Sequence, residues 1–206
     1  MTNDILFRLF IFVFMVANFT ISGYFRKKAD QATGKTSFSE ENQFLLTLRN
    51  IGALLMYGSI LVYLIYPPIL AWAKIGLSTT ARYITLGIMA LFIPAFYWLF
   101  SNLGKNVTPT VAIRKEHNLI TTGPYRWIRH PLYTFGSLNI LTLALAADSW
   151  FILIATIVTF IPLALRTPQE EEKLIQAFGD DYRQYMQLTG RYFPKTFRGA
   201  KDLYAD

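Results

Sequence analysis

Five long apolar runs, separated by polar segments, make up most of this chain of 206 residues. They are Ile5 to Tyr24, Phe44 to Tyr66, Ala81 to Phe100, Leu132 to Ala147 and Trp150 to Leu165. The first three have the roughly 20 residues that a helix needs to cross a hydrocarbon core of about 30 Å. The last two have 16 residues each with only Asp148-Ser149 between them, which predicts a tight helical hairpin that crosses a thin bilayer or packs inside the bundle. The pattern therefore predicts an all-α integral membrane protein with about five transmembrane helices.

The segment after the fifth run predicts an amphipathic carboxyl-terminal helix. Thr167, Pro168 and Glu170 have the spacing of a helix start, with Thr as N-cap, proline at the first position and Glu completing a capping box. Gly179 weakens this helix by about 1 kcal/mol, and Gly190 is its expected stop. Apolar residues recur at every fourth position and form one stripe, which suits a helix lying on the membrane surface: Leu174, Phe178, Tyr182 and Met186.

Lys and Arg are unevenly distributed between the segments that connect the runs. If the helices alternate in direction, residues 26–43, 101–131 and the tail from Arg166 share one side and most of the basic residues, whereas the opposite side has only Lys74 and Arg82. Cytoplasmic segments of membrane proteins carry the excess of positive charge. We therefore expect a multi-pass protein with this side in the cytoplasm, in the plasma membrane of a prokaryote or the endoplasmic reticulum of a eukaryote.

Composition excludes several kinds of site. The chain has no cysteine, and its two histidines are too few for a convincing zinc site, so no metal is expected. No G-x-G occurs, which excludes a Rossmann fingerprint and a P-loop. The net charge of +7 lies at the ends of apolar runs, so we expect membrane lipids and no nucleic acid as partners. Residues 1–206 are expected to form one domain, with three membrane helices in 1–100 and a polar loop, the hairpin and the tail in 101–206.

The polar stretch from Arg114 to Tyr133, RKEHNLITTGPYRWIRHPLY, lies between the third and fourth runs. Gly-Pro in this stretch forces a turn, and Pro131 marks a helix start. Arg129, His130 and Tyr133 would then cluster at the amino end of a helix, where free N–H groups favour a carboxylate or phosphate. The alternative is that these side chains only contact lipid phosphates at the interface.

Arg166 and Glu170 are spaced i, i+4 where the fifth run ends. Arg166 either extends its guanidinium to the interface or orients an anionic substrate, and Glu170 either caps the tail helix or faces a cation. Glu171 and Glu172 are expected to be solvated, with Glu171 in reserve for the role of Glu170. Arg49 is expected at the interface, with a role in a pocket as the alternative.

Two segments together resemble a known family. HNLITTGPYRWIRHPLY, followed about 30 residues later by RTPQEEEKLIQAFGDDYRQYMQLTGRYFPK, resembles the isoprenylcysteine carboxyl methyltransferase family of integral membrane methyltransferases. The resemblance covers about Leu103 to Lys195. Phospholipid N-methyltransferases and the carboxyl ends of membrane sterol reductases have similar patterns.

The resemblance implies that the connecting loop, the amino end of the hairpin and the tail bind S-adenosylmethionine, which is converted to S-adenosylhomocysteine. Glu170 would meet the amino group of the cofactor, and Arg166 would contact the substrate. The other cofactor residues implied by the motif are His117, Asn118, Leu119 and Ile120 on the adenosine side, Tyr125 packed on the cofactor, and Arg129, His130, Pro131, Leu132 and Tyr133 along its border, with His130 and Tyr133 near its carboxylate.

The chemistry of the residues agrees with this assignment. Methyl transfer to a carboxylate needs no general base, because the nucleophile is already ionised, so alignment and exclusion of water would carry catalysis. The expected reaction is carboxyl O-methylation of a prenylated cysteine or a similar lipidic carboxylate that enters sideways from the bilayer. The alternatives are N-methylation of a phospholipid or amine, with Glu170 or Glu171 as base, a sterol-type reductase using NADPH, and a membrane scaffold that binds anionic lipid.

Overall fold

The computed structural model describes residues 2–34, 42–107 and 118–195. In these ranges every regular element is helical: α1 (Thr2–Thr33), α2 (Gln43–Ile65), α3 (Thr79–Leu103), α4 (Pro131–Ala146), α5 (Trp150–Phe178) and α6 (Asp180–Leu188), with the 3₁₀ turns η1 (Pro67–Ala73), η2 (Gly104–Asn106) and η3 (Gly123–Arg126). The prediction of an all-α chain is confirmed. Four helices, α1, α2, α3 and α5, are long and apolar enough to cross a membrane, and α4 is a shorter apolar helix.

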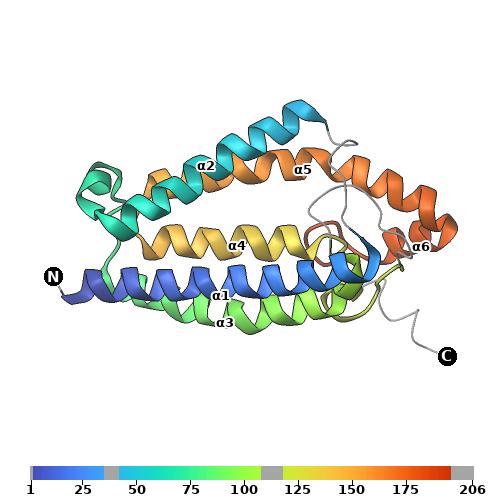
Figure 1. Ribbon diagram of the computed structural model, residues 1–206, viewed down its shortest axis with the longest axis horizontal. Helices are drawn as coiled ribbons and strands as arrows, with labels where there is room; N and C mark the ends of the chain where they lie inside the picture. Colours follow the sequence, from blue (N-terminus) through green and yellow to red (C-terminus); the bar gives the residue numbers. More distant parts are fainter. Residues whose placement is uncertain (1, 35–41, 108–117, 196–206) are drawn as a thin grey trace.

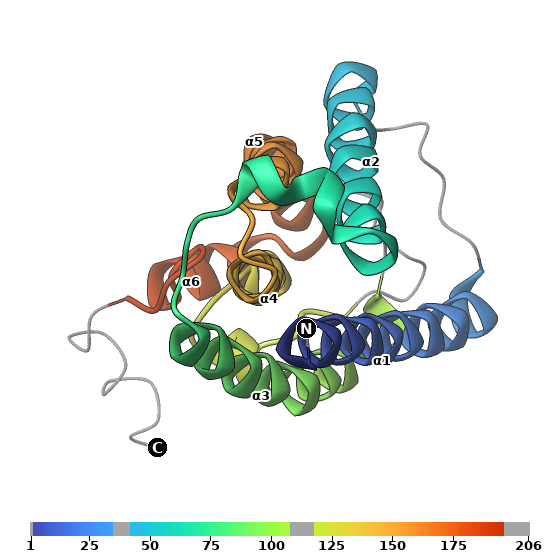
Figure 2. The same cartoon turned by 90° about the vertical axis from the view of Figure 1, so that its left-hand side faces the viewer.

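The short helix α4 lies inside the bundle. It packs between α3 and α5, while α2 packs along α5 and α1 along α3 (Figures 1 and 2). Large apolar side chains on the outer helices, such as Phe12, Leu54 and Leu91, are exposed, as expected for surfaces that face lipid. Of the two sequence alternatives for the hairpin, packing within the bundle describes α4.

The turn between α4 and α5 is tightly held. Asp148 has a positive φ of 54° and accepts hydrogen bonds from the backbone N–H groups of Gly76 and Leu77 at 3.0 and 2.9 Å. Ser149 caps the start of α5. Buried apolar residues fill the half of the bundle next to this turn, including Phe7, Ile11, Ile60, Met89, Leu143 and Ile152. The predicted tight hairpin is confirmed.

The predicted helix start at Thr167 is wrong. α5 continues through this position to Phe178, and the Thr167 hydroxyl donates to the carbonyl of Leu163 at 3.0 Å instead of capping a new helix. Pro168 removes the hydrogen bond to the Ala164 carbonyl, which accepts one from the Tyr192 hydroxyl at 3.4 Å. A distant residue therefore supports the helix where the local signal predicted a break.

The predicted single tail helix is also wrong, because Gly179 separates two helices. This glycine has a φ of 58° and ends α5, and α6 begins at the next residue. Glycine reaches this left-handed backbone conformation without the steric penalty of a side chain. The chain can therefore turn at Gly179 and bring α6 back toward the loop before α4. α6 ends at Leu188, two residues before the expected stop at Gly190.

Gly52 allows α2 and α5 to approach closely, which gives a first testable prediction. A Cβ at this position would lie 2.9 Å from the Thr159 Cα, whereas a Cβ at Gly58 on the same helix would meet no atom within 4 Å. Gly52→Ala should therefore lower the free energy of unfolding by about 1–3 kcal/mol, measured by thermal unfolding in detergent. Gly58→Ala is the control and should be neutral or stabilising; equal effects of the two substitutions would contradict the close packing.

Candidate functional site

The end of the bundle opposite the hairpin turn is closed by the tail segment, residues 189–195. This segment runs beside the loop that precedes α4: Gly190 N–H donates to the Trp127 carbonyl at 3.1 Å, and Arg129 N–H donates to the Gly190 carbonyl at 2.8 Å. His130 N–H continues the pattern to the Arg191 carbonyl at 3.0 Å. A Cβ on Gly190 would lie 1.6 Å from the Phe193 carbonyl oxygen, so the tight path of the segment requires glycine here.

His130 is the residue from which α4 begins. Its carbonyl accepts hydrogen bonds from the N–H groups of Tyr133 and Thr134 at 3.1 and 3.3 Å, and Pro131 occupies the first turn. The predicted helix start at Pro131 is confirmed. Leu132 and Tyr133 follow on the first turn and face a cavity between the helices.

A buried ion-pair cluster around Glu171 joins the loop, α5 and the tail segment. The Arg129 Nε donates to Glu171 Oε1 at 2.9 Å, His130 Nε2 lies 3.3 Å from the same oxygen, and Arg191 pairs with Oε2. Arg129 also donates to the carbonyls of Met186 and Thr189. Glu171 is only 3% exposed, so the expectation that it is solvated is wrong, whereas its neighbour Glu172 is exposed as predicted. The guanidinium of Arg129 therefore joins α5 to the end of α6 and the start of the tail segment.

Next to it lies a second group of side chains, the Glu170 cluster, formed by His130, Tyr133, Arg166 and Glu170. The Tyr133 hydroxyl donates to Glu170 Oε1 at 2.5 Å and accepts from Arg166 Nη2 at 2.8 Å. Arg166 Nη2 lies 2.9 Å from Glu170 Oε1, and His130 Nδ1 lies 3.6 Å from Glu170 Oε2. The His130 ring stacks on the Tyr133 ring with centroids 5.6 Å apart. The structure thus brings together four residues that the sequence placed in one site.

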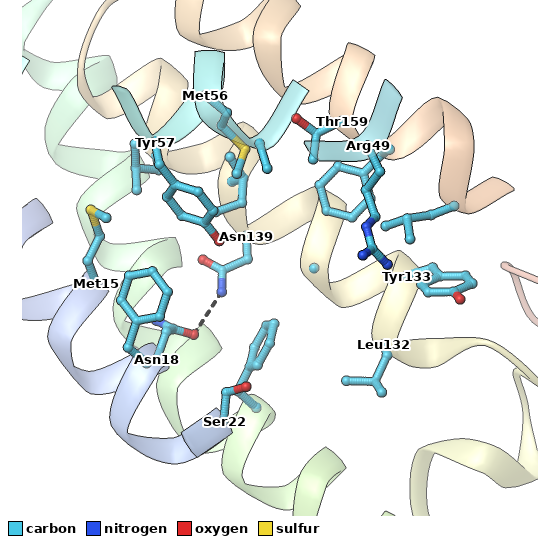
Figure 3. Close-up of a pocket in the computed structure, with 18 of the residues that line it drawn as sticks. Met15, Asn18, Ser22, Arg49, Met56, Tyr57, Leu132, Tyr133, Asn139 and Thr159 are labelled. Carbon is cyan, nitrogen blue, oxygen red and sulfur yellow. Dashed lines mark hydrogen bonds between the residues drawn. The ribbon is translucent and has the colours of Figure 1, made fainter. Parts of the chain in front are cut away.

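A cavity of about 570 Å³ begins at this cluster and extends between α1, α2, α3, α4 and α5 (Figure 3). Its volume is in the range of small-molecule sites. Most of its lining is apolar, and its polar lining residues are Asn18, Ser22, Arg26, Arg49, Tyr57, Tyr133, Asn139, Thr159 and Arg166. Three of these are arginines, and no Asp or Glu belongs to the lining that the described residues form. We call this space the arginine-lined cavity.

The adenosine-side residues implied by the motif are only partly placed. His117 lies outside the described residues, and Asn118 is tied to Asn106, whose Nδ2 donates to the Asn118 carbonyl at 2.7 Å. Leu119 and Ile120 follow in irregular, half-buried backbone before η3. Residues 118–120 therefore lie in irregular backbone between η2 and η3, and their contact with an adenosine group stays a prediction.

Tyr125 stands on η3 and is buried, and its backbone carbonyl accepts from the Tyr185 hydroxyl at 2.6 Å. Its own hydroxyl has no hydrogen-bond partner among the described residues. Burial raises the pKa of the Tyr125 phenol, so the group remains a protonated donor. A buried donor that no described residue satisfies fits a polar ligand on this side of the loop.

Sequence reasoning missed part of the cavity lining. For Arg49, the alternative given above describes the structure: it lines the cavity and points toward Tyr133 (Figure 3). Asn18 and Asn139 also line it and had not been singled out. The available signal was their position inside apolar runs, since a polar side chain at membrane depth usually has a functional role.

A known protein family matches the part of the chain that carries most of these residues. The model of the isoprenylcysteine carboxyl methyltransferase (ICMT) family matches residues 84–176. A solved structure of the eukaryotic intramembrane Ras methyltransferase ICMT aligns with a TM-score of 0.50 and 19% identity, covering 78% of this chain and 55% of that one. The fold is therefore shared with that structure, and the resemblance to the family is confirmed.

Three relatives match over part of their length. Methanethiol S-methyltransferase 1 of Bradyrhizobium diazoefficiens is 36% identical over 97 residues, 45% of this chain and 29% of that protein. Protein-S-isoprenylcysteine O-methyltransferase B of Arabidopsis thaliana is 33% identical over 87 residues, 41% of this chain and 44% of that protein. The cobalt-zinc-cadmium resistance protein CzcN of Cupriavidus metallidurans is 33% identical over 85 residues, 40% of this chain and 38% of that protein. The match spans less than half the length of each of these relatives.

Proposed function

We propose that this chain is a membrane methyltransferase that uses S-adenosylmethionine to methylate the carboxylate of a lipidic acceptor at the cytoplasmic face. The observation that carries the proposal is the contact between the Glu170 cluster and the arginine-lined cavity, because Tyr133 and Arg166 belong to both. One set of side chains can therefore hold a cofactor on one side and an acceptor on the other. The family match and the names of two relatives support methyl transfer as the reaction.

The Glu170 cluster has the groups that S-adenosylmethionine requires. Glu170 is a carboxylate on which an ammonium group can bind, and His130 and the Tyr133 hydroxyl are polar partners for a carboxylate. In the loop before α4, the buried Tyr125 hydroxyl is a further donor, and it has no hydrogen-bond partner among the residues that the structure describes. When bound, the cofactor would supply an electrophilic methyl group on a sulfonium. The protein's part is to hold both ends of the cofactor and to exclude water from its charges.

The charge of the cavity favours an anionic acceptor. Arg26, Arg49 and Arg166 line it, and its described lining has no carboxylate that would hold an amine or remove a proton from one. A carboxylate bound to a guanidinium is already ionised and needs no base. This charge supports carboxyl O-methylation in preference to N-methylation of an amine. The acceptor class that fits is a prenylated cysteine or a similar lipidic carboxylate.

The lining of the cavity also explains why the acceptor should be lipidic. Away from the arginines, its walls are aromatic and aliphatic side chains of α4 and of the four helices that are long enough to span a bilayer. An apolar chain buried there is removed from water at a gain of about 25 cal/mol per Å². The excess of Lys and Arg at the end of the bundle that carries the Glu170 cluster supports the proposed cytoplasmic location of this end.

The test is calorimetry of S-adenosylhomocysteine binding to the detergent-solubilised protein. We expect a dissociation constant on the order of micromolar and at least about tenfold weaker binding in His130→Ala and in Glu170→Ala, because each variant removes a charge-assisted contact. Glu172→Gln is the control, because Glu172 lies two positions after Glu170 on α5 and is exposed, and this variant should bind S-adenosylhomocysteine like the unmodified protein. Unchanged affinity in both site variants would overturn the assignment.

A further inference from the structure

Two asparagines meet inside the bundle, away from the charged end of the arginine-lined cavity. Asn139 on α4 donates from its Nδ2 to the Asn18 Oδ1 on α1 at 3.0 Å (Figure 3). Both residues line the cavity, among apolar neighbours that include Phe14, Met15, Ile140 and Leu143. Amides in such surroundings are costly unless their donors and acceptors are paired.

One polar atom of this pair has no hydrogen-bond partner among the described residues. The Asn18 Nδ2 donates to the Phe14 carbonyl at 2.8 Å, and its oxygen accepts from Asn139, so Asn18 is paired at both ends. Asn139 is only 3% exposed, and its Oδ1 accepts no hydrogen bond from any described residue. Figure 3 shows this oxygen on the side of the Asn139 amide that faces Tyr57, away from the bond to Asn18. A pair that served only to join α1 and α4 would not require an acceptor that is left without a donor.

The position of Asn139 along α4 gives the distance from its unpaired oxygen to the charged end of the cavity. Asn139 follows Tyr133 by six positions on α4, and at a rise of 1.5 Å per residue the two levels are about 9 Å apart along the helix. An extended chain gains about 1.2 Å per bond, so this distance corresponds to roughly seven bonds. A molecule whose carboxylate lies at Arg166 would pass Asn139 about seven bonds further along.

We propose that the acceptor is a long-chain carboxylate that carries a hydroxyl or N–H donor roughly seven bonds from its carboxyl group, and that Asn139 receives this donor. The inference rests on the proposed function, because it uses Arg166 as the carboxylate end of the site. Asn18 acts as the positioning residue, since it fixes the amide of Asn139 in one orientation. An all-hydrocarbon prenyl chain would leave the Asn139 oxygen unpaired and would bind less tightly.

The experiment compares three octadecanoic acids on the full chain in detergent, with S-adenosylhomocysteine at saturation. One acid carries a hydroxyl about seven bonds from the carboxyl carbon, one carries it at the far end of the chain, and one has none. We expect the first to bind about tenfold more tightly than the other two. In Asn139→Leu this preference should disappear while the plain acid binds as well or better. Thr20→Ala is the control, because this exposed polar residue of α1 lies outside the lining of the cavity, and it should keep the preference.

The outcomes separate the two proposals. If the unmodified protein does not bind S-adenosylhomocysteine, the proposed function itself is refuted. Normal cofactor binding with equal affinities for the three acids would refute the inference alone, and would mean that an internal water satisfies Asn139. If Asn139→Leu fails to fold, the comparison of the two hydroxyl positions on the unmodified protein still decides the question.

Discussion

Replacing Glu171 by alanine should lower the free energy of unfolding by about 3–5 kcal/mol, because it leaves a buried guanidinium without its partner. The side chains of Arg129 and Glu171 are only 7% and 4% exposed, so water cannot replace the lost carboxylate. The contact of Arg191 with Glu171 contributes less, since the Arg191 side chain is 42% exposed and screened by solvent. The buried contact with Arg129 therefore accounts for most of the expected loss.

The same substitution should release the tail segment. Glu171 joins the loop before α4 to Arg191. Without it, the remaining links to the tail segment are backbone hydrogen bonds such as those of Arg129 and His130, and side-chain hydrogen bonds such as that from the Thr134 hydroxyl to the Tyr192 carbonyl. Thermal unfolding and limited trypsin cleavage after Arg191 and Lys195 would measure the two effects together. Glu172→Ala changes the same charge at an exposed neighbouring position and should shift stability by no more than about 0.5 kcal/mol. Equal stability and cleavage in the two variants would show that the ion-pair cluster does not hold the tail.

Replacing Arg166 by lysine should lower the rate of methyl transfer by about 100-fold while cofactor binding changes little. The guanidinium contacts the Tyr133 hydroxyl through both Nε and Nη2, at 3.1 and 2.8 Å, and reaches Glu170 from Nη2 at 2.9 Å. A lysine keeps the charge but has one ammonium in place of the planar fork. A single ammonium can keep the contact with Glu170, so the cofactor site is retained, but it has no second nitrogen with which to orient the carboxylate of the acceptor.

The measurement is the initial rate with an isotopically labelled methyl donor and S-farnesylcysteine as acceptor, alongside calorimetry of S-adenosylhomocysteine. Arg183→Lys is the matched control, because this arginine is exposed, pairs with Asp180 on the surface of α6, and should tolerate the change. A rate in Arg166→Lys within about twofold of the unmodified protein would remove Arg166 from the acceptor site.

Glu170 and Glu171 show how neighbouring residues on one helix come to serve two purposes. Successive residues on an α-helix point about 100° apart, so Glu170 faces Tyr133 and Arg166 while Glu171 faces Arg129 and the tail segment. His130 touches both carboxylates, with Nδ1 toward Glu170 and Nε2 toward Glu171. The cluster that stabilises the fold therefore also orients a residue of the proposed cofactor site.

The amino-acid sequence alone specifies the features that depend on local physics. Apolar runs of membrane length specify the long helices, the positive φ of Asp148 and the Ser149 cap form the hairpin turn, and Pro131 specifies the start of α4, because each of these signals acts through residues near in the chain. The clustering of His130 and Tyr133 with Arg166 and Glu170 could also be predicted, because the family resemblance joins the two segments that carry them. The break at Thr167 could not be judged locally, since Tyr192 supports the helix there from 25 positions away.

Which side chains are buried, and which residues they contact, depends on the packing of distant segments in the tertiary structure. Glu170 and Glu171 are the same residue type at adjacent positions, and burial of Glu171 depends on Arg129 and on a tail that returns after Gly179. Asn18 and Asn139 are 121 positions apart and make a pair only because α1 and α4 face the same cavity. Hydropathy places a residue in the membrane but carries no information on which helix it faces, and that choice is made by the packing of the whole bundle.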